Sequence, residues 1–164
     1  MDVSSFAELE ADFAARTNRI VWCTFATIDR RGRPRSRMLH PVWELGERPV
    51  GWIATGRTSH KAVHLEANPN VSCTYWDPGH EQAHADCLAS WADDQPTRHR
   101  VWALLRDTPP PVGYDPGLFW PDGPDSPGYG ALRLDPWRVE VWSLADLIGG
   151  REPRVWRAPD RSGA

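Results

Sequence analysis

The sequence predicts a mainly β domain with a few helices, in which antiparallel strands close, or nearly close, into a barrel. Its 164 residues, 40% of them hydrophobic, match the size of one domain with its own core. Six or seven short runs rich in β-branched and aromatic residues are separated by turn signals, and only two or three segments have helical spacing. This pattern favours an antiparallel barrel over a parallel sheet with alternating helices.

The composition excludes several classes of protein. The net charge of −3 comes from 19 basic and 22 acidic residues, so nothing in it indicates a nucleic-acid or membrane-surface partner. There is no apolar run of about 20 residues, and the first residues lack the pattern of a signal peptide. We therefore expect a cytoplasmic protein. The three cysteines Cys23, Cys73 and Cys87 are odd in number and far apart, which indicates reduced, buried thiols.

The first element that the sequence predicts is an amphipathic helix. Ser5 and Glu8 have the spacing of a capping box. Apolar residues then recur at helical spacing through Phe13, so the helix is expected to end near Arg16.

A hairpin and two further strands are expected next, with one short helix between them. The sequence Asp29-Arg30-Arg31-Gly32 supplies the hairpin turn, and Asn68-Pro69 ends the helix. The expected elements are strand 20–28, strand 34–43, strand 50–55, helix 59–67 and strand 71–76.

The second half of the chain contains weaker signals. A strand is expected over 81–91 and a helix over 96–106, because Pro96 suits a first helical turn. Residues 108–129 are rich in proline and glycine, and Tyr114, Phe119 and Trp120 are expected to anchor them as an ordered loop. Two strands, 131–135 and 137–144, are expected to be separated by Asp135-Pro136. Residues 1–148 would form the domain and 149–164 a polar, frayed tail.

One stretch has the chemistry of an anion site. Ala54-Thr55-Gly56-Arg57-Thr58-Ser59-His60-Lys61 places hydroxyls, a glycine and a cation where a strand ends and a helix begins. Free N–H groups at the helix start, the Ser59 hydroxyl and the Lys61 ammonium can converge on one phosphate. The alternative is that Thr58 or Ser59 only caps the helix and that Lys61, the single lysine of the chain, is solvated.

The hairpin supplies a further cation. Arg33, Arg35 and Arg37 alternate along the second hairpin strand and so share one face. One of them can reach the same phosphate.

In their order, four segments resemble the pyridoxamine 5′-phosphate oxidase-like flavin and deazaflavin oxidoreductases. They are Gly32 to Trp43, Trp52-Ile53-Ala54-Thr55, Ser59-x-Lys61 and Asn68-Pro69-x-Val71, and the resemblance covers about residues 20–77. It implies a split, Greek-key-like β-barrel that forms a homodimer and binds a flavin across the subunit interface. Downstream, the substrate-phosphate residues and the C-terminal motif of true pyridoxamine phosphate oxidases are not recognised, so the resemblance does not supply the substrate.

The resemblance also implies the residues that bind the cofactor. Arg37, Ser59 and Lys61 would hold the flavin phosphate. The backbone would line the isoalloxazine ring at two segments, which are Met38, Leu39 and His40, and Ile53, Ala54 and Thr55. Trp52, Trp76 and Trp142 are candidates for the walls of the ring site.

The function expected from these features is an FMN-dependent oxidoreductase acting on a small organic substrate. F420 is the alternative cofactor, because its phosphate can use the same Ser59 and Lys61. A flavin-binding protein or sensor without turnover is a third hypothesis, since no catalytic acid, base or nucleophile can be named and no G-x-S-x-G elbow is present.

Two histidine groups suggest metal binding as a competing hypothesis. His80, His84 and Cys87 have a spacing that can ligate zinc, and His60 and His64 lie one helical turn apart. Neither set supplies four ligands of familiar spacing, so no metal is expected.

Overall fold

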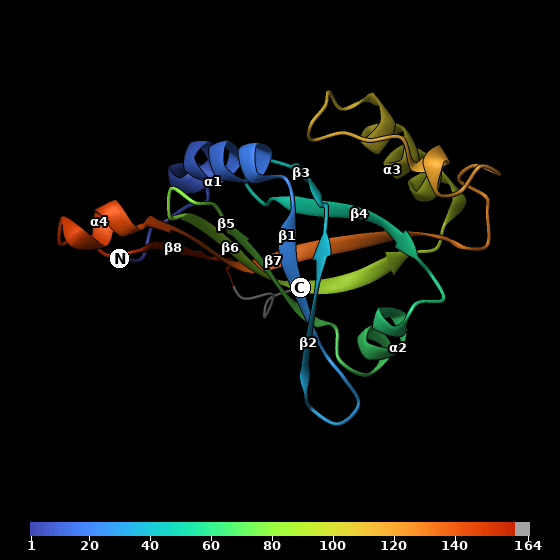
Figure 1. The fold of residues 1–164 in the computed structure, drawn as a ribbon, viewed down its shortest axis with the longest axis horizontal. Coiled ribbons are helices and arrows are strands. Elements are labelled where there is room, and N and C mark those ends of the chain that lie inside the picture. Colours follow the sequence, from blue (N-terminus) through green and yellow to red (C-terminus); the bar gives the residue numbers. More distant parts are fainter. Residues whose placement is uncertain (160–164) are drawn as a thin grey trace.

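A computed structural model describes residues 1–159 of the chain. Its eight strands form one sheet, and every strand pair is antiparallel (Figure 1). This confirms the mainly β, antiparallel fold with few helices. The elements are α1 (Ala7–Ile20), β1 (Cys23–Ile28), β2 (Pro34–Leu39), β3 (Val42–Glu44), β4 (Val50–Gly56), α2 (His60–Ala67), β5 (Asn70–Trp76), β6 (Glu81–Ala92), α3 (Gln95–Asp107), the 3-10 helix η1 (Pro116–Leu118), β7 (Tyr129–Ser143), α4 (Leu144–Ile148) and β8 (Arg154–Arg157).

The order of the strands shows that the sheet rolls up. Along the sheet the order is β2-β1-β5-β6-β7-β4-β3, with β8 paired to β7. The two end strands, β2 and β3, are consecutive in the chain, and only His40 and Pro41 lie between Leu39 and Val42. Three Cα steps span at most about 11 Å, so the ends of the sheet must meet. His40 therefore lies at the seam of the barrel.

The longest strand, β7, differs from its sequence prediction. The sequence indicated a break at Asp135-Pro136, whereas β7 runs through it as one strand. The ladder between β6 and β7 shifts register next to Asp86 and Cys87, at the point where Pro136 is paired. Because proline has no N–H to donate, the irregularity is a bulge in the ladder, and the strand does not end there. The residues before the bulge pair with β4, and those after it pair with β8.

Inward-facing side chains fill the barrel, and α1 packs against the same core. Cys23, Cys73 and Cys87 are free thiols inside the core, as the sequence predicted. The helix α1 lies along the sheet (Figure 1) and buries Leu9 and Phe13. It continues to Ile20, four residues beyond the predicted end.

The expectation of a frayed tail from residue 149 is wrong for residues 154–157. These residues form β8 on β7, and Val155 and Trp156 are buried. The ring of Trp156 packs edge-on against Phe6 of the N-terminal segment, with 5.5 Å between centroids. The end of the described chain thus closes part of the core. Residues 160–164 of the expected tail lie outside the described residues.

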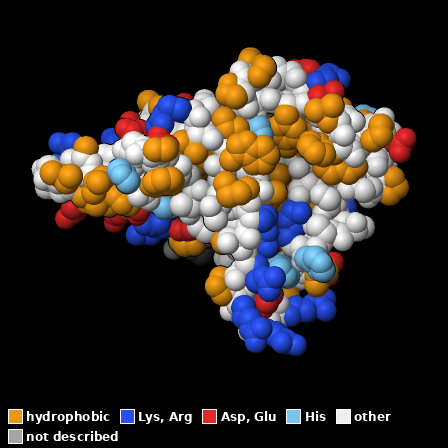
Figure 2. Space-filling view, viewed as in Figure 1, with side chains coloured by type: hydrophobic (Ala, Val, Ile, Leu, Met, Phe, Trp, Pro, Cys, Tyr) orange, Lys and Arg blue, Asp and Glu red, His pale blue; other side chains and the backbone are white. Residues whose placement is uncertain are grey.

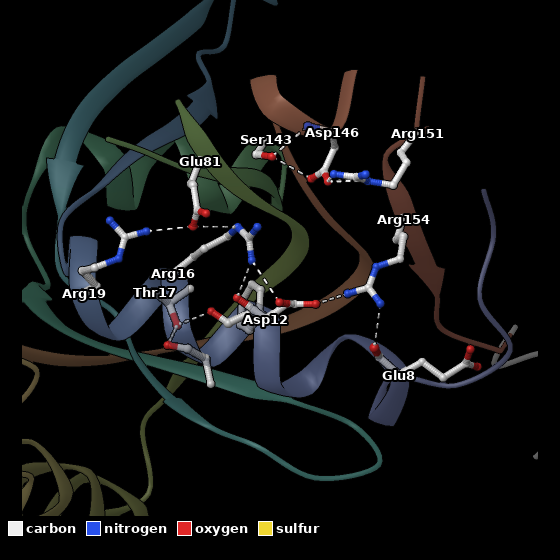
Figure 3. Close-up of polar contacts among 12 residues, drawn as sticks. Glu8, Asp12, Arg16, Thr17, Arg19, Glu81, Ser143, Asp146, Arg151 and Arg154 are labelled. Atoms are coloured by element: carbon white, nitrogen blue, oxygen red, sulfur yellow. Dashed lines mark hydrogen bonds and ion pairs between the residues drawn. The ribbon is translucent and has the colours of Figure 1, made fainter. Parts of the chain in front are cut away.

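A network of ion pairs joins α1 to β6 and β8 (Figure 3). Asp12 pairs with Arg16 and with Arg154, and Arg16 also lies 3.6 Å from Glu81. Arg16 is the buried member of the network, since its side chain is 10% exposed. Asp12, Arg16 and Arg154 border a cavity of about 630 Å³ between α1, β7, α4 and β8. Its arginines are ion-paired, so it is not a candidate site for an anion.

We predict that Asp12→Asn destabilises the fold by about 1–2 kcal/mol, because the change removes the shared partner of two arginines, one of them buried. Urea unfolding measures this difference, which should shrink in high salt. Asp2→Asn is the matched control, because its ion pair with Arg157 is long, at 3.9 Å, and exposed. An equal loss in both variants would contradict a special role for Asp12.

None of the helices within residues 1–159 is long and apolar enough to cross a membrane.

Candidate functional site

The predicted phosphate site forms at the junction of β4 and α2. Ser59 precedes α2 in an extended conformation, but its side chain does not cap the helix. Its hydroxyl donates to the carbonyl of Gly56 at 2.8 Å and accepts from Lys61 Nζ at 2.8 Å. Ser59 is therefore not the helix cap that the alternative hypothesis required. The first N–H groups of α2 are left without a side-chain cap.

Arg37 approaches the same region from β2. Its guanidinium donates to the carbonyl of Phe25 at 3.2 Å and to Thr27 Oγ1 at 2.8 Å, both on the neighbouring strand β1. Thr27 Oγ1 also lies 2.9 Å from Nδ1 of His64 on α2. Thr27 thus links Arg37 to the helix that contains Lys61.

The electrostatics indicate an excess of positive charge at this point. Burial lowers the pKa of Lys61, and the nearby charge of Arg37 lowers it further. Burial also lowers the pKa of Arg37, with a contribution from Arg35. Neither Arg37 nor Lys61 is ion-paired with a carboxylate of the described chain. Figure 2 shows the Lys and Arg side chains gathered beside histidines on this part of the surface.

This donor set fits a phosphate monoester. Two half-buried cations without a counter-ion, a hydroxyl and a helix start all favour an anion bearing about two negative charges. Repulsion between the cations is relieved when such an anion binds between them. The structure thus brings together Ser59 and Lys61 with Arg37, the arginine that the resemblance assigned to the phosphate.

The loop after α3 reaches the predicted ring-binding segment of β4. The side chains of Ile53 and Thr55 are buried. Ala54 lies outside the ladder between β3 and β4, because the first residue of β3, Val42, pairs with Trp52. Its N–H donates to the hydroxyl of Tyr114 at 3.2 Å. A side chain from the loop after α3 therefore holds one of the backbone groups that the sequence assigned to the ring.

The other ring-binding segment, Met38 to His40, lies at the seam of the barrel. The side chain of Met38 is 55% exposed, Leu39 packs against the core, and His40 is half-buried. The His40 ring packs at tilted angles against two aromatic rings, with centroid distances of 5.2 Å to Trp22 and 4.7 Å to Tyr114.

The sequence reasoning missed several residues of this site. Thr27 was not singled out, His64 was named only in the metal hypothesis, and Trp22 was not among the aromatic candidates. Tyr114 was expected only as a loop anchor, and no local pattern places its hydroxyl on β4, 60 residues away.

The tryptophans proposed as walls of the ring site do not come together, so that expectation is wrong. Trp52 is buried and donates to Glu44 at 2.6 Å. Trp76 is exposed beside His80, and Trp142 borders the cavity between α1 and α4.

The zinc hypothesis has no geometric support. His84 is half-buried and lies on β6 near Thr74 and Gln82, whereas Cys87 points to the opposite, core-facing side of the same strand. Within residues 1–159 no three histidine, cysteine or acidic side chains gather as a metal site.

Comparison with known proteins agrees with this fold. Residues 9–143 match the family described as pyridoxamine 5′-phosphate oxidase. A pyridoxamine 5′-phosphate oxidase-related, FMN-binding protein from Nostoc punctiforme is 23% identical, with a TM-score of 0.65 over 96% of this chain and 98% of that one.

Two further solved structures resemble the chain. A protein related to general stress protein 26, from Clostridium acetobutylicum, is 12% identical, with a TM-score of 0.71 over 92% of this chain and 94% of its own. An F420 reductase is 17% identical, with a TM-score of 0.56 over 77% of this chain and 94% of that one. No curated protein matches significantly. The match across most of the sequence, together with the shared fold, shows that this chain belongs to the pyridoxamine 5′-phosphate oxidase family.

Proposed function

We propose that the protein is an FMN-dependent oxidoreductase that acts on a small organic substrate. The observation that carries this proposal is the pair of uncompensated cations, Arg37 and Lys61, around Ser59 at the start of α2. These groups would bind the phosphate of FMN. A bound flavin supplies two-electron chemistry, formally hydride transfer. The chain itself binds and orients the cofactor, with the backbone of residues 38–40 and 53–55 beside the ring.

We also propose that the protein is a homodimer and that the ring site lies at the subunit interface. Met38 and Trp22 are more than half exposed next to the ring site. Figure 2 shows hydrophobic side chains gathered in the middle of this face, above the basic hairpin. Such exposed apolar groups are typical of an interface. Sedimentation equilibrium tests the proposal, and a monomer in the presence of cofactor would contradict it. A cytoplasmic location stays a prediction.

The visible spectrum of the purified protein, alone and after addition of FMN, tests the main proposal. We expect the bands of bound, oxidised flavin. The bound FMN should then be reduced by a nicotinamide nucleotide and reoxidised by an organic acceptor. Protein that binds FMN but does not cycle would be the non-catalytic flavin-binding protein or sensor. Protein that binds neither FMN nor F420 would contradict the proposal.

A second candidate is an F420-dependent reductase, which a row of arginines on the hairpin favours. Arg31, Arg33 and Arg35 are exposed, and none forms an ion pair within the described residues. The charge of Arg35 reaches Arg37 at the phosphate site. F420 continues beyond its phosphate into a chain of glutamates, whereas FMN ends there. A basic strand leading away from the phosphate site suits the longer polyanion.

We predict that Arg33→Ala/Arg35→Ala weakens F420 binding about fivefold and changes FMN affinity less than twofold, because two exposed ion pairs contribute little each. Titrations followed by coenzyme fluorescence measure both affinities. Arg48→Ala/Arg157→Ala removes the same charge elsewhere and is the matched control. Equal losses for both coenzymes would remove the reason to favour F420.

A further inference from the structure

Three aromatic side chains from distant parts of the chain pack against one another at the seam of the barrel. Trp22 precedes β1, His40 follows β2, and Tyr114 comes from the loop after α3. The backbone of that loop is fixed, because Tyr114 N donates to the carbonyl of Leu105 at 2.8 Å. A Cβ at the preceding Gly113 would lie 1.7 Å from the carbonyl oxygen of Thr108, so only glycine fits there. The backbone of Tyr114 is therefore held in one position.

His40 has a buried ring nitrogen without a hydrogen-bond partner among the described residues. Burial lowers the pKa of His40, and the backbone of Val112 partly opposes that shift, so the ring is neutral near pH 7. Nε2 is buried and has no hydrogen-bond partner. In the neutral tautomer that carries its proton on Nδ1, the lone pair lies on Nε2. Because a buried acceptor without a partner is destabilising, a ligand that donates to it gains affinity.

Tyr114 provides a donor beside this acceptor. Its hydroxyl accepts from the Ala54 N–H at 3.2 Å, and within the described chain no group accepts its own proton. Burial raises the pKa of Tyr114 to about 12, so the hydroxyl remains protonated. The His40 and Tyr114 rings lie 4.7 Å apart. Within the part of the chain that the structure describes, the seam thus holds an unpartnered imidazole nitrogen and a phenolic proton without an acceptor on two adjacent rings.

We propose that His40 Nε2 and the Tyr114 hydroxyl recognise the imide edge of the coenzyme ring, where an N–H lies beside a carbonyl. FMN and F420 both contain this edge in their pyrimidinedione ring. The inference rests on the proposed function, because the phosphate end of the same molecule is assigned to Arg37. Arg37 and His40 are three residues apart, about 10 Å along an extended chain, which a ribityl linker can bridge.

Trp22 is the movable cover of this pair. It is 54% exposed and packs on His40. The residue before it, Val21, has a φ of 66° and a ψ of −60°, and Trp22 N donates to the carbonyl of Ile20 at 2.7 Å. This is a γ-turn centred on a β-branched residue, a strained conformation. On this proposal Trp22 moves aside when the coenzyme ring binds to His40 Nε2, and relaxation of the turn at Val21 favours that movement.

Two ring probes without phosphate test the inference. They are lumiflavin and its 3-methyl derivative, which lacks the imide N–H. Their dissociation constants, and that of FMN, are measured by fluorescence for the wild type, His40→Phe and Tyr114→Phe. These variants keep the aromatic contacts and remove only the polar atoms. We expect each to weaken lumiflavin and FMN by about 3- to 10-fold, the effect of one hydrogen bond.

The methylated probe separates recognition from a structural effect. Wild type should prefer lumiflavin to the 3-methyl derivative, and His40→Phe should lose this preference. Competition between inorganic phosphate and FMN should be the same in both proteins. Trp22→Ala should increase the association rate of lumiflavin, measured by stopped flow.

The outcomes distinguish the two levels of the proposal. If the wild type binds FMN but neither variant changes its affinity, or if discrimination against the methyl group persists in His40→Phe, the imide assignment is wrong and the proposed function stands. If lumiflavin associates with Trp22→Ala no faster than with the wild type, Trp22 is not a cover of this site. If the wild type binds neither FMN nor F420, both the inference and the proposed function fail.

Discussion

Arg37→Ala/Lys61→Ala should weaken FMN binding by about 3 kcal/mol, or roughly 150-fold, because two charge-assisted hydrogen bonds to one phosphate are lost. Both side chains are half-buried, so solvent weakens these bonds less than those of exposed cations. Fluorescence titration with FMN measures the change. Riboflavin, which lacks the phosphate, should bind the variant and the wild type with similar affinity.

The fold of this variant should remain intact. The free energy of unfolding is expected to change by less than about 1 kcal/mol, because the lost hydrogen bonds from Arg37 to Phe25 and Thr27 are offset by relief of the repulsion from Lys61. Arg48→Ala/Arg157→Ala changes the net charge equally and should leave FMN affinity unaltered. An unchanged affinity in Arg37→Ala/Lys61→Ala would show that the phosphate lies elsewhere.

Phe13→Ala should lower the free energy of unfolding by about 3–5 kcal/mol, the usual result of removing a fully buried aromatic side chain. The Phe13 ring packs edge-on against Trp43 at 5.1 Å and against Phe6 at 5.9 Å. Trp43 in turn donates to the hydroxyl of Tyr75 at 2.9 Å inside the barrel. The cavity would thus open where α1 meets both β3 and β5.

Urea unfolding followed by circular dichroism measures this loss. Leu118→Ala is a suitable control, because Leu118 is 78% exposed and its truncation removes little buried area. A loss below about 1 kcal/mol in Phe13→Ala would mean that α1 is not part of the cooperative core.

The elements predicted well from the sequence have local signals. A turn, a helix cap or a helix-ending residue lies within a few residues of the ends of β1, β2, β4 and α2. Asn68-Pro69, for example, marks the end of α2. Ser59 and Lys61 are two residues apart, so their contact follows from the start of a helix. Arg37 joined them only through the family resemblance, because pairing between β1 and β2 decides which arginine faces α2.

The remaining features depend on contacts between distant residues. Nothing near Val155 and Trp156 distinguishes a buried strand from a polar tail, because the strand exists only by pairing with β7. Pro136 indicated a break, although a proline at a bulge leaves no ladder bond unmade. Tyr114 meets Ala54 only because the loop after α3 folds back over the edge of β4.

The three thiols of the core make it possible to measure how often the barrel opens. Cys23, Cys73 and Cys87 have no exposed surface and lie on β1, β5 and β6, which are neighbours in the sheet. A water-soluble thiol reagent can reach them only when these strands separate. The rate of labelling therefore measures how often the barrel comes apart, and a coenzyme that clamps the seam at His40 should slow that rate.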